Sequence, residues 1–436
     1  MRGGWAERLL ALLCAAATAA CTTAAPPPGP ASGAQPIPTF ASPAGAPACR
    51  GVDGYAADFG GRRTFTWRPE GLLASRSRLT QPAVAEAHAA LIERADAALA
   101  GPSYTVVDKS RPPPSGDRHD YAILGVYWWP NPAKRDGLPY VRRDGVVNPE
   151  RNGPAYDASD MSAMSTAVES LALAHFFTDE RRYADKAAQL LRVWFLDPST
   201  RMNPRLNFAQ GVPGLHQGRA AGLLDTHRLL RVVESVGLLA PSGALSEAEQ
   251  AALRSWFGDY VEWLLTSELG REEGAATNNH GLWYAYQVAA FALFAGKDAI
   301  ARTTLASAPR RLAQQIAPDG SLPEELGRTR SLHYTAFALA AAANLAELGR
   351  CVGLDLWAVQ TPDGRGLRRA VDYVGAYAGR EQAWPHSERN REFGPELYEV
   401  LSLAARRFPD GAYAAQAAAI APRYTATNLA LRLGPP

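Results

Sequence analysis

Hydrophobic residues recur at helical spacing through most of the chain from about residue 159 onward. In one segment, for example, Ala184, Ala187, Leu190, Leu191 and Trp194 fall on a single face of a helix. Strand-like alternation of apolar and polar residues is scarce. The pattern therefore predicts helices over residues 161–177, 183–195, 220–236, 247–265, 280–295, 297–316, 333–348 and 367–377.

The predicted helices come in pairs. An Ala-rich apolar helix is followed by a short turn and then by a more charged, amphipathic helix, as in residues 171–188 and 288–311. The pairs differ in loop length and have no fixed repeat period. Stacked helix pairs form either a solenoid or a closed α/α toroid, with the more buried helices as the inner ring. We predict an all-α fold and favour the toroid, an incomplete α/α barrel, because the long aromatic loops suit the lining of a cleft.

The N-terminus has the pattern of an exported protein. Arg2 and Arg8 precede an apolar run and a stretch of small residues, which predicts a signal peptide over residues 1–21. The sequence Thr-Ala-Ala-Cys that ends at Cys21 resembles a lipoprotein cleavage site, which would make Cys21 a lipid anchor. Residues 22–50 are rich in Pro, Ala, Gly and Ser and predict a tether, followed by one domain over residues 51–436. We expect a periplasmic protein or an outer-membrane lipoprotein.

Two of the four cysteines lie outside this leader. In an oxidising compartment Cys49 and Cys351 can pair, and a buried, unpaired Cys351 is the alternative. No later apolar run reaches the roughly 18 residues that a membrane-spanning helix needs.

Overall charge and motif content exclude several classes of protein. The chain carries 45 Lys and Arg against 43 Asp and Glu, a net charge of +2, which gives no indication of nucleic-acid binding. It has no Cys/His pair, no HExxH arrangement and no acidic calcium loop. We therefore predict neither a metal site nor an obligatory cofactor.

A long irregular stretch between residues 125 and 160 is rich in aromatic and basic side chains. A loop of this length in a globular domain is usually functional or disordered, and its aromatic content argues against disorder. The rings could stack on sugar faces and the cations could contact carboxylates; the alternative is a loop pinned to the domain by its aromatic residues. The candidates for substrate contact are Tyr127, Trp128, Trp129, Lys134, Arg142 and Arg143, with His216 as a weaker one.

Two polar clusters stand at predicted helix starts. Asn278, Asn279 and His280 open the helix predicted from residue 280, where free N–H groups favour an anionic ligand. Arg328 and Arg330 precede a helix that contains His333 and Tyr334. Structural roles are the alternative: Asn278 as a cap, His280 packed, the arginines exposed and the tyrosine half-buried.

Together these groups form a set suited to one kind of reaction. Amide and guanidinium groups can neutralise a carboxylate, while imidazole and phenol can transfer protons. That combination fits removal of a weakly acidic proton beside a carboxylate, as in β-elimination from a uronic-acid polysaccharide.

The chain resembles the alginate lyase family in several segments that follow one another in the expected order. Members carry an Asn-Asn-His motif and, downstream, an Arg followed by a Leu-His-Tyr segment, which stand here at residues 278–280 and at 328 and 332–334. Further similarity covers residues 127–132, 137–145, 203–210 and 266–269. The resemblance spans roughly residues 100–400 and implies an α/α toroid and a lyase that acts on an acidic polysaccharide.

The resemblance also implies roles for individual residues. Asn279 would bind the substrate carboxylate with help from Arg328, and His280 and Tyr334 would share the proton transfers. The spacing from Arg328 to Tyr334 is one residue shorter than in the best-studied branch, which makes Arg330 the alternative carboxylate ligand. For this reason glucuronan stands beside alginate as a possible substrate.

Two other functions compete with the lyase. A glycoside hydrolase would need two carboxylates about 5–10 Å apart, for which Glu272, Glu324, Glu325 and Asp225 are available. A surface lipoprotein that binds glycans without cleaving them is the non-enzymatic alternative.

Overall fold

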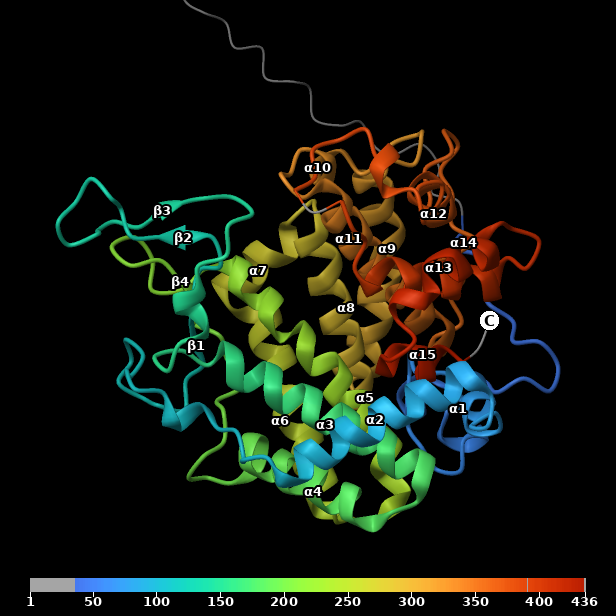
Figure 1. The fold of residues 1–436 in the computed structure, drawn as a ribbon, viewed down its shortest axis with the longest axis horizontal. Helices are drawn as coiled ribbons and strands as arrows, with labels where there is room; N and C mark the ends of the chain where they lie inside the picture. Colours follow the sequence, from blue (N-terminus) through green and yellow to red (C-terminus); the bar gives the residue numbers. More distant parts are fainter. Residues whose placement is uncertain (1–35, 390, 435–436) are drawn as a thin grey trace, which may run out of the picture. The chain divides into compact units, whose positions relative to one another are not determined.

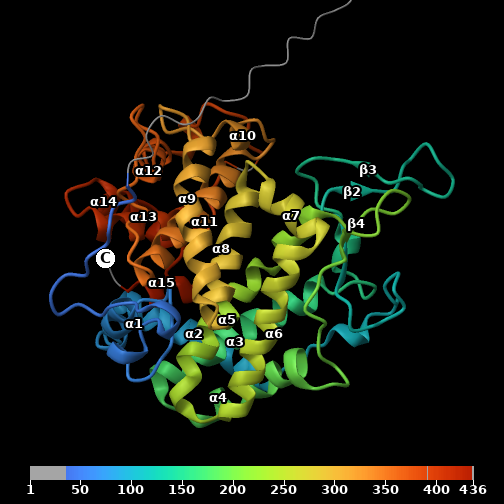
Figure 2. The same ribbon diagram turned by 180° about the vertical axis from the view of Figure 1, so that it is seen from behind.

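A computed structural model describes residues 36–389 and 391–434. The predicted signal peptide with Cys21, and residues 22–35 of the predicted tether, lie outside the described residues. A compact unit begins at Ile37. Its longer helices are shown in Figures 1 and 2, and they are α2 (Pro82–Ala100), α3 (Ala158–Thr178), α4 (Arg181–Leu191), α5 (Leu229–Leu239), α6 (Glu247–Thr266), α8 (Asn279–Phe294), α9 (Asp298–Gln315), α11 (Ser331–Cys351) and α13 (Pro395–Arg407).

Shorter helices connect and close the array. They are α1 (Pro69–Arg76), α7 (Glu268–Ala275), α10 (Pro323–Leu326), α12 (Leu367–Gly375), α14 (Tyr413–Ile420) and α15 (Asn428–Leu433). The strongly one-sided α4 and α12 bury their apolar stripe and leave the charged face in water.

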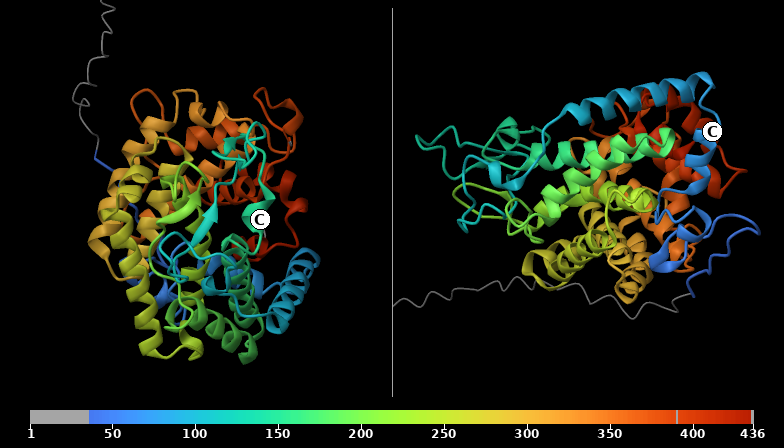
Figure 3. Two further views of the ribbon diagram at one scale, coloured as in Figure 1. Left: turned by 90° about the vertical axis from the view of Figure 1, so that its left-hand side faces the viewer. Right: turned by 90° about the horizontal axis from the view of Figure 1, so that it is seen from below.

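The most apolar helices form an inner layer. Almost every residue of α5, α8 and α11 is buried, and most of these residues are apolar. Within the compact unit α3 packs on α5, α5 on α8, α8 on α11 and α11 on α13, while α15 and α2 connect α13 back to α3. Figure 3 shows the helices from two further sides. The predicted all-α toroid is confirmed.

Local helix type differs from the prediction between residues 192 and 228. The predicted helix 183–195 ends its α-helical part at Leu191 and continues as a π-helical turn. The predicted helix 220–236 begins with the 3-10 segment Ala220–Arg228, and α-helix starts only at Leu229. Thr226 explains part of this, since its hydroxyl bonds to the Leu223 carbonyl and to buried polar groups of α6 and α8.

The irregular stretch contains two short strand pairs. Strand β1 (Ala122–Leu124) pairs in parallel with β4 (Phe208–Gly211). Strand β2 (Trp128–Trp129) pairs antiparallel with β3 (Val141–Arg142). We call residues 126–148 the β2–β3 hairpin. Figure 1 shows it at the left of the helices, next to β4.

The N-terminal segment lies across the C-terminal ends of the inner helices. Thr39 forms a β-bridge with Leu354, and a disulfide joins Cys49 to Cys351, the last residue of α11. The Arg63 guanidinium donates to the carbonyls of residues 293 and 294 at the end of α8. Residues 37–50, expected as the end of the tether, therefore belong to the compact unit, which leaves the helix N-termini at the opposite end available for a site.

Candidate active site

The N-terminus of α8 holds the Asn-Asn-His motif. Asn278 caps the helix, because its Oδ1 accepts the backbone N–H of His280 at 3.1 Å. Gly281 lets the preceding connection come close: a Cβ there would lie 2.0 Å from the Ala276 carbonyl oxygen. The first turn of α8 is thereby fixed, and the partial positive charge of the helix start adds to the site.

Asn279 is fully buried and bound to a carboxylate. Its Nδ2 lies 3.0 and 2.9 Å from the two oxygens of Glu325 on α10, and its backbone N–H donates to the same carboxylate at 2.6 Å. Glu325 is only 1% exposed. Asn279 Oδ1 is buried and has no hydrogen-bond partner.

His280 is bound by a second buried carboxylate. Its Nδ1 lies 2.6 Å from Oε1 of Glu273 on α7. The side chain of His280 is 20% exposed, against 5% for Glu273, so the imidazole reaches solvent while the carboxylate does not. A carboxylate accepts the Nδ1–H, which leaves Nε2 of the neutral ring as the free lone pair.

Arg328 and Tyr334 form the other half of the site. The Arg328 guanidinium stacks on the Tyr334 ring at 3.8 Å from its centroid. The Tyr334 hydroxyl lies 2.6 Å from the Tyr127 hydroxyl on the hairpin. Burial, assisted by Tyr127 and opposed by Arg328, raises the pKa of Tyr334 well above its ordinary value. Tyr334 is therefore a protonated phenol at neutral pH.

The β2–β3 hairpin is attached to the segment that carries Arg328. Asp144 accepts hydrogen bonds from Arg328 at 3.1 Å and from the Thr329 hydroxyl at 3.0 Å. Gly145 has a φ of +72°, and a Cβ at this position would lie 2.6 Å from Thr329 Oγ1. The hairpin thus approaches the start of α11 closely enough to require glycine.

Glu325 connects the two halves electrostatically. Burial raises its pKa, while hydrogen bonds from Asn279 and the charges of Arg328 and His280 lower it. The proposed catalytic residues Asn279, His280, Arg328 and Tyr334 therefore lie in one cluster, which we call the active-site cluster, at the parallel N-termini of α8 and α11.

Arg330 and His333 border this cluster. The His333 ring lies 5.1 Å from that of Tyr334 and stacks on Phe337. Burial, reinforced by the nearby positive charges of Arg330 and Arg328, lowers the pKa of His333 to about 4, so this histidine is neutral at pH 7. The Arg330 backbone forms a β-bridge with Glu388, and its Nε is buried without a partner.

The hairpin residues divide between the cluster and the surface. Among the candidates for substrate contact, Tyr127 is hydrogen-bonded to Tyr334 of the cluster. Trp129 carries Arg143 over its ring and donates its indole N–H to the Val146 carbonyl. Lys134, Arg142 and Arg143 are exposed. These contacts support both interpretations of the aromatic loop, since Trp129 helps to hold the hairpin while the three cations lie at its surface, where Arg142 pairs with Asp144.

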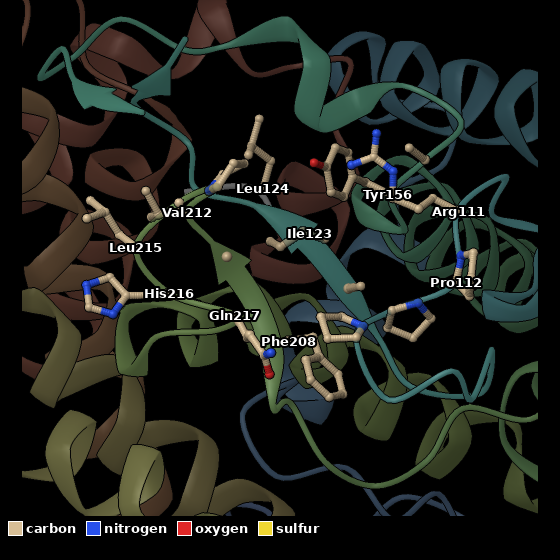
Figure 4. Close-up of a pocket in the computed structure, with 17 residues that line it drawn as sticks. Arg111, Pro112, Ile123, Leu124, Tyr156, Phe208, Val212, Leu215, His216 and Gln217 are labelled. Carbon is tan, nitrogen blue, oxygen red and sulfur yellow. The ribbon is translucent and has the colours of Figure 1, made fainter. Parts of the chain in front are cut away.

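His216 lies apart from the cluster. It lines a cavity of about 500 Å³ between the β1–β4 pair and the Pro-rich loop of residues 111–114 (Figure 4). Arg111, Tyr156 and Phe208 are among the other lining residues. Of the residues described, none that lines this cavity belongs to the active-site cluster.

Three acidic residues of the site were not assigned these roles from the sequence. Glu325 was considered only as one carboxylate of a hydrolase, and neither Glu273 nor Asp144 was singled out. Glu273 lies 7 residues from its partner along the chain, Glu325 lies 46 residues from its partner, and Asp144 lies 184 residues from its partner. No sequence signal connects these three acidic residues with their partners, because the contacts form only when the chain is folded.

Two structural findings bear on metals and membranes. Within residues 36–389 and 391–434 no group of three or more His, Cys, Asp or Glu side chains could hold a metal ion. Over the same residues no helix has the length and apolar character needed to cross a bilayer.

The toroid and the active-site cluster define a polysaccharide lyase. The chain belongs to the alginate lyase family, whose model matches residues 105–384. This confirms the resemblance seen in the motifs and identifies the protein as an enzyme.

The chain is also similar to two solved structures. It is similar to an alginate lyase from Bacteroides ovatus, with 34% identity and a TM-score of 0.80 over 86% of this chain and 99% of that one. It shares its fold with alginate lyase A1-III from Sphingomonas species A1, with 17% identity and a TM-score of 0.50 over 79% of this chain and 91% of that one. A search of curated proteins returned no match.

Proposed function

We propose that this enzyme cleaves a uronic-acid polysaccharide by β-elimination, with alginate, in particular polymannuronate, as the first candidate and glucuronan as the second. The observation that carries the proposal is the active-site cluster, in which two carboxylate-binding groups and two proton-transfer groups meet at two helix N-termini. The similar protein from Bacteroides ovatus is described as an alginate lyase, which supports the choice of substrate.

Carboxylate binding falls to Asn279 and Arg328. Removal of the C5 proton places a second negative charge next to the sugar carboxylate, and donors fixed in advance stabilise that charge as it develops. Arg328 is held by Asp144 and by the Tyr334 ring, and Asn279 by Glu325. Both side chains are therefore held in place before the substrate arrives, which lowers the cost of forming the dianion.

His280 is the proposed base. Glu273 accepts its Nδ1–H, so that Nε2 can take the C5 proton, and the resulting imidazolium is stabilised by the buried carboxylate at 2.6 Å. General-base catalysis of this kind contributes about 10²–10⁴ to the rate.

Tyr334 is the proposed acid. Its raised pKa keeps it protonated at neutral pH, and the Arg328 guanidinium over its ring stabilises the phenolate once the proton has left. The electron pair of the C5–H bond becomes the C4–C5 double bond, the C4–O bond breaks, and the leaving oxygen takes the phenol proton. The products are a 4,5-unsaturated uronate end and a new reducing end.

Hydrolysis is a poorer fit to the same residues. Glu325 is bound by Asn279, and Asp225 is buried against Arg151 and Gln210. Glu272 and Glu324 are exposed. A glycosidase needs an acid and a second carboxylate that both face the sugar, and these four do not form such a pair.

The proposed place of action is outside the cytoplasm. The signal-peptide pattern of residues 1–21 supports export, with Cys21 as a lipid anchor on the periplasmic or outer-membrane side. The Cys49–Cys351 disulfide adds support, because such bonds persist in oxidising compartments.

The test is incubation of the enzyme with polymannuronate, polyguluronate and glucuronan while ultraviolet absorbance of the C4–C5 alkene is followed. We expect alkene from polymannuronate first. Alkene from glucuronan alone would reassign the substrate, and release of oligosaccharides without alkene would refute elimination.

A further inference from the structure

The orientation of the Asn279 amide conflicts with its proposed task. Its Nδ2 points to both oxygens of Glu325, and its Oδ1 is buried without a partner. The two N–H bonds of an amide diverge, and the two oxygens of one carboxylate are too close together for each to accept a different N–H. A single N–H of Asn279 is therefore shared between the Glu325 oxygens. A substrate carboxylate next to this amide would meet an orphaned acceptor and a buried anion.

A rotation of the Asn279 side-chain amide by half a turn exchanges its oxygen and its nitrogen and leaves the occupied positions the same. Amide oxygen and nitrogen are assigned from their hydrogen-bond partners, so the question is which partner can donate. If Glu325 carries a proton, Oε1 still accepts the Asn279 backbone N–H at 2.6 Å, and Oε2–H can donate to the amide oxygen. Glu325 and the amide oxygen of Asn279 are then satisfied, and the two amide N–H bonds take the buried position that has no partner within the protein and face away from Glu325.

We propose that Glu325 is a positioning residue that binds a proton from solvent and thereby holds Asn279 with its amide donors turned toward the substrate carboxylate. This inference rests on the proposed function, since it states which protonation state of Glu325 allows Asn279 to bind the substrate carboxylate. Glu325 itself does not touch the reacting atoms.

The surroundings of Glu325 favour the neutral form during substrate binding. The carboxyl is 1% exposed, and burial is the largest influence on its pKa, in the upward direction. The charged groups that act against this are His280 at the start of α8 and Arg328 in the α10–α11 connection. A bound uronate adds a negative charge beside Glu325 and engages Arg328, and both effects raise the pKa further. Substrate affinity is therefore lost as pH rises through the pKa of Glu325.

Glu325→Gln separates the two protonation states. Glutamine is a neutral isostere whose Oε1 accepts the backbone N–H and whose Nε2 donates to Asn279 Oδ1, so it fixes the donor-outward amide. We expect kcat/KM at neutral pH within about threefold of the wild type. We also expect the rise of KM at high pH to be smaller than in the wild type. Glu325→Ala, which leaves Asn279 unsupported, should lower kcat/KM by about 10- to 100-fold.

Glu324→Gln is the matched control, because Glu324 is the exposed neighbour on the same helix. It should leave kcat, KM and the pH profile unchanged. If Glu325→Gln melts like the wild type but is as inactive as Glu325→Ala, the ionised carboxylate is required and the inference is wrong. If the wild type forms no alkene from any uronate polymer, the proposed function fails, a result that is distinct from an inactive glutamine variant.

Infrared difference spectroscopy tests the proton without a substitution at Glu325. The Tyr334→Phe variant is used because it does not turn over the substrate. Binding of an oligomannuronate tetrasaccharide to this variant should strengthen the C=O band of a protonated carboxyl, measured at a pH where the band is weaker in the free enzyme. An unchanged band across the whole pH range, with binding confirmed by calorimetry, would overturn the inference.

Discussion

The hydrogen bond between Glu273 and His280 gives the sharpest quantitative prediction. Glu273→Gln keeps the shape of the side chain and removes its charge. The glutamine can accept from Nδ1 through its oxygen, or donate to Nδ1 through its amide, and the second arrangement moves the ring proton to Nε2. A base protonated at Nε2 cannot take the C5 proton.

The size of the effect follows from the contact that is lost. A buried hydrogen bond to a charged group is worth about 1.5–3 kcal/mol, and this one joins atoms 2.6 Å apart with the carboxylate 5% exposed. Since 1.36 kcal/mol corresponds to a factor of ten, kcat should fall by about 10- to 150-fold. KM should change little, because Glu273 does not contact the sugar carboxylate in this account.

The assay is the initial rate of alkene formation on polymannuronate, with kcat and KM determined separately. Glu272→Gln is the matched control, since Glu272 is exposed on the same helix. An unchanged kcat in Glu273→Gln, or an equal loss in the control, would refute the assignment of His280 as a base oriented by Glu273.

Three further predictions test other parts of the structure. Arg328→Ala should reduce kcat/KM more than Arg330→Ala, because only Arg328 stacks on the catalytic tyrosine; the reverse order of the two kcat/KM values would make Arg330 the carboxylate ligand. Tyr127→Phe should lower kcat by about 2- to 10-fold, which corresponds to the loss of one hydrogen bond. It should also move the high-pH fall in kcat to lower pH, because Tyr127 raises the pKa of Tyr334; an unchanged pH profile would contradict this effect of Tyr127. The double variant Cys49→Ser, Cys351→Ser should lower the free energy of unfolding by at most about 6 kcal/mol, because the disulfide closes a loop of 302 residues; urea unfolding measures this loss. The folded variant should keep its activity in the alkene assay, because the disulfide lies at the far end of α11, about 30 Å from the N-terminus of that helix.

Helical periodicity predicted the main frame of the fold because the inner helices are long and apolar. The starts of α8 and α11 fall within two residues of those expected at 280 and 333. Residues 220–228 were wrongly predicted as α-helix, because the spacing of apolar residues does not record that Thr226 bonds to the carbonyl of Leu223 and to two buried side chains of α6 and α8.

The site was accessible from the sequence only where its residues are adjacent. Asn278, Asn279 and His280 stand together at a helix start, where capping chemistry is local. The role of Glu325 depends on a contact over 46 residues, and that of Asp144 on one over 184 residues. Long-range contacts of this kind arise from the packing of α10 and the hairpin against two helices, which no local pattern specifies.

The most direct test of the central claim is a product balance for each cleavage. New reducing ends and C4–C5 alkenes are counted in parallel during digestion of polymannuronate by the wild type and by Tyr334→Phe. We expect one alkene for each new reducing end in the wild type, and loss of both products in a folded Tyr334→Phe variant. Reducing ends without alkene, or a fully active Tyr334→Phe, would contradict it.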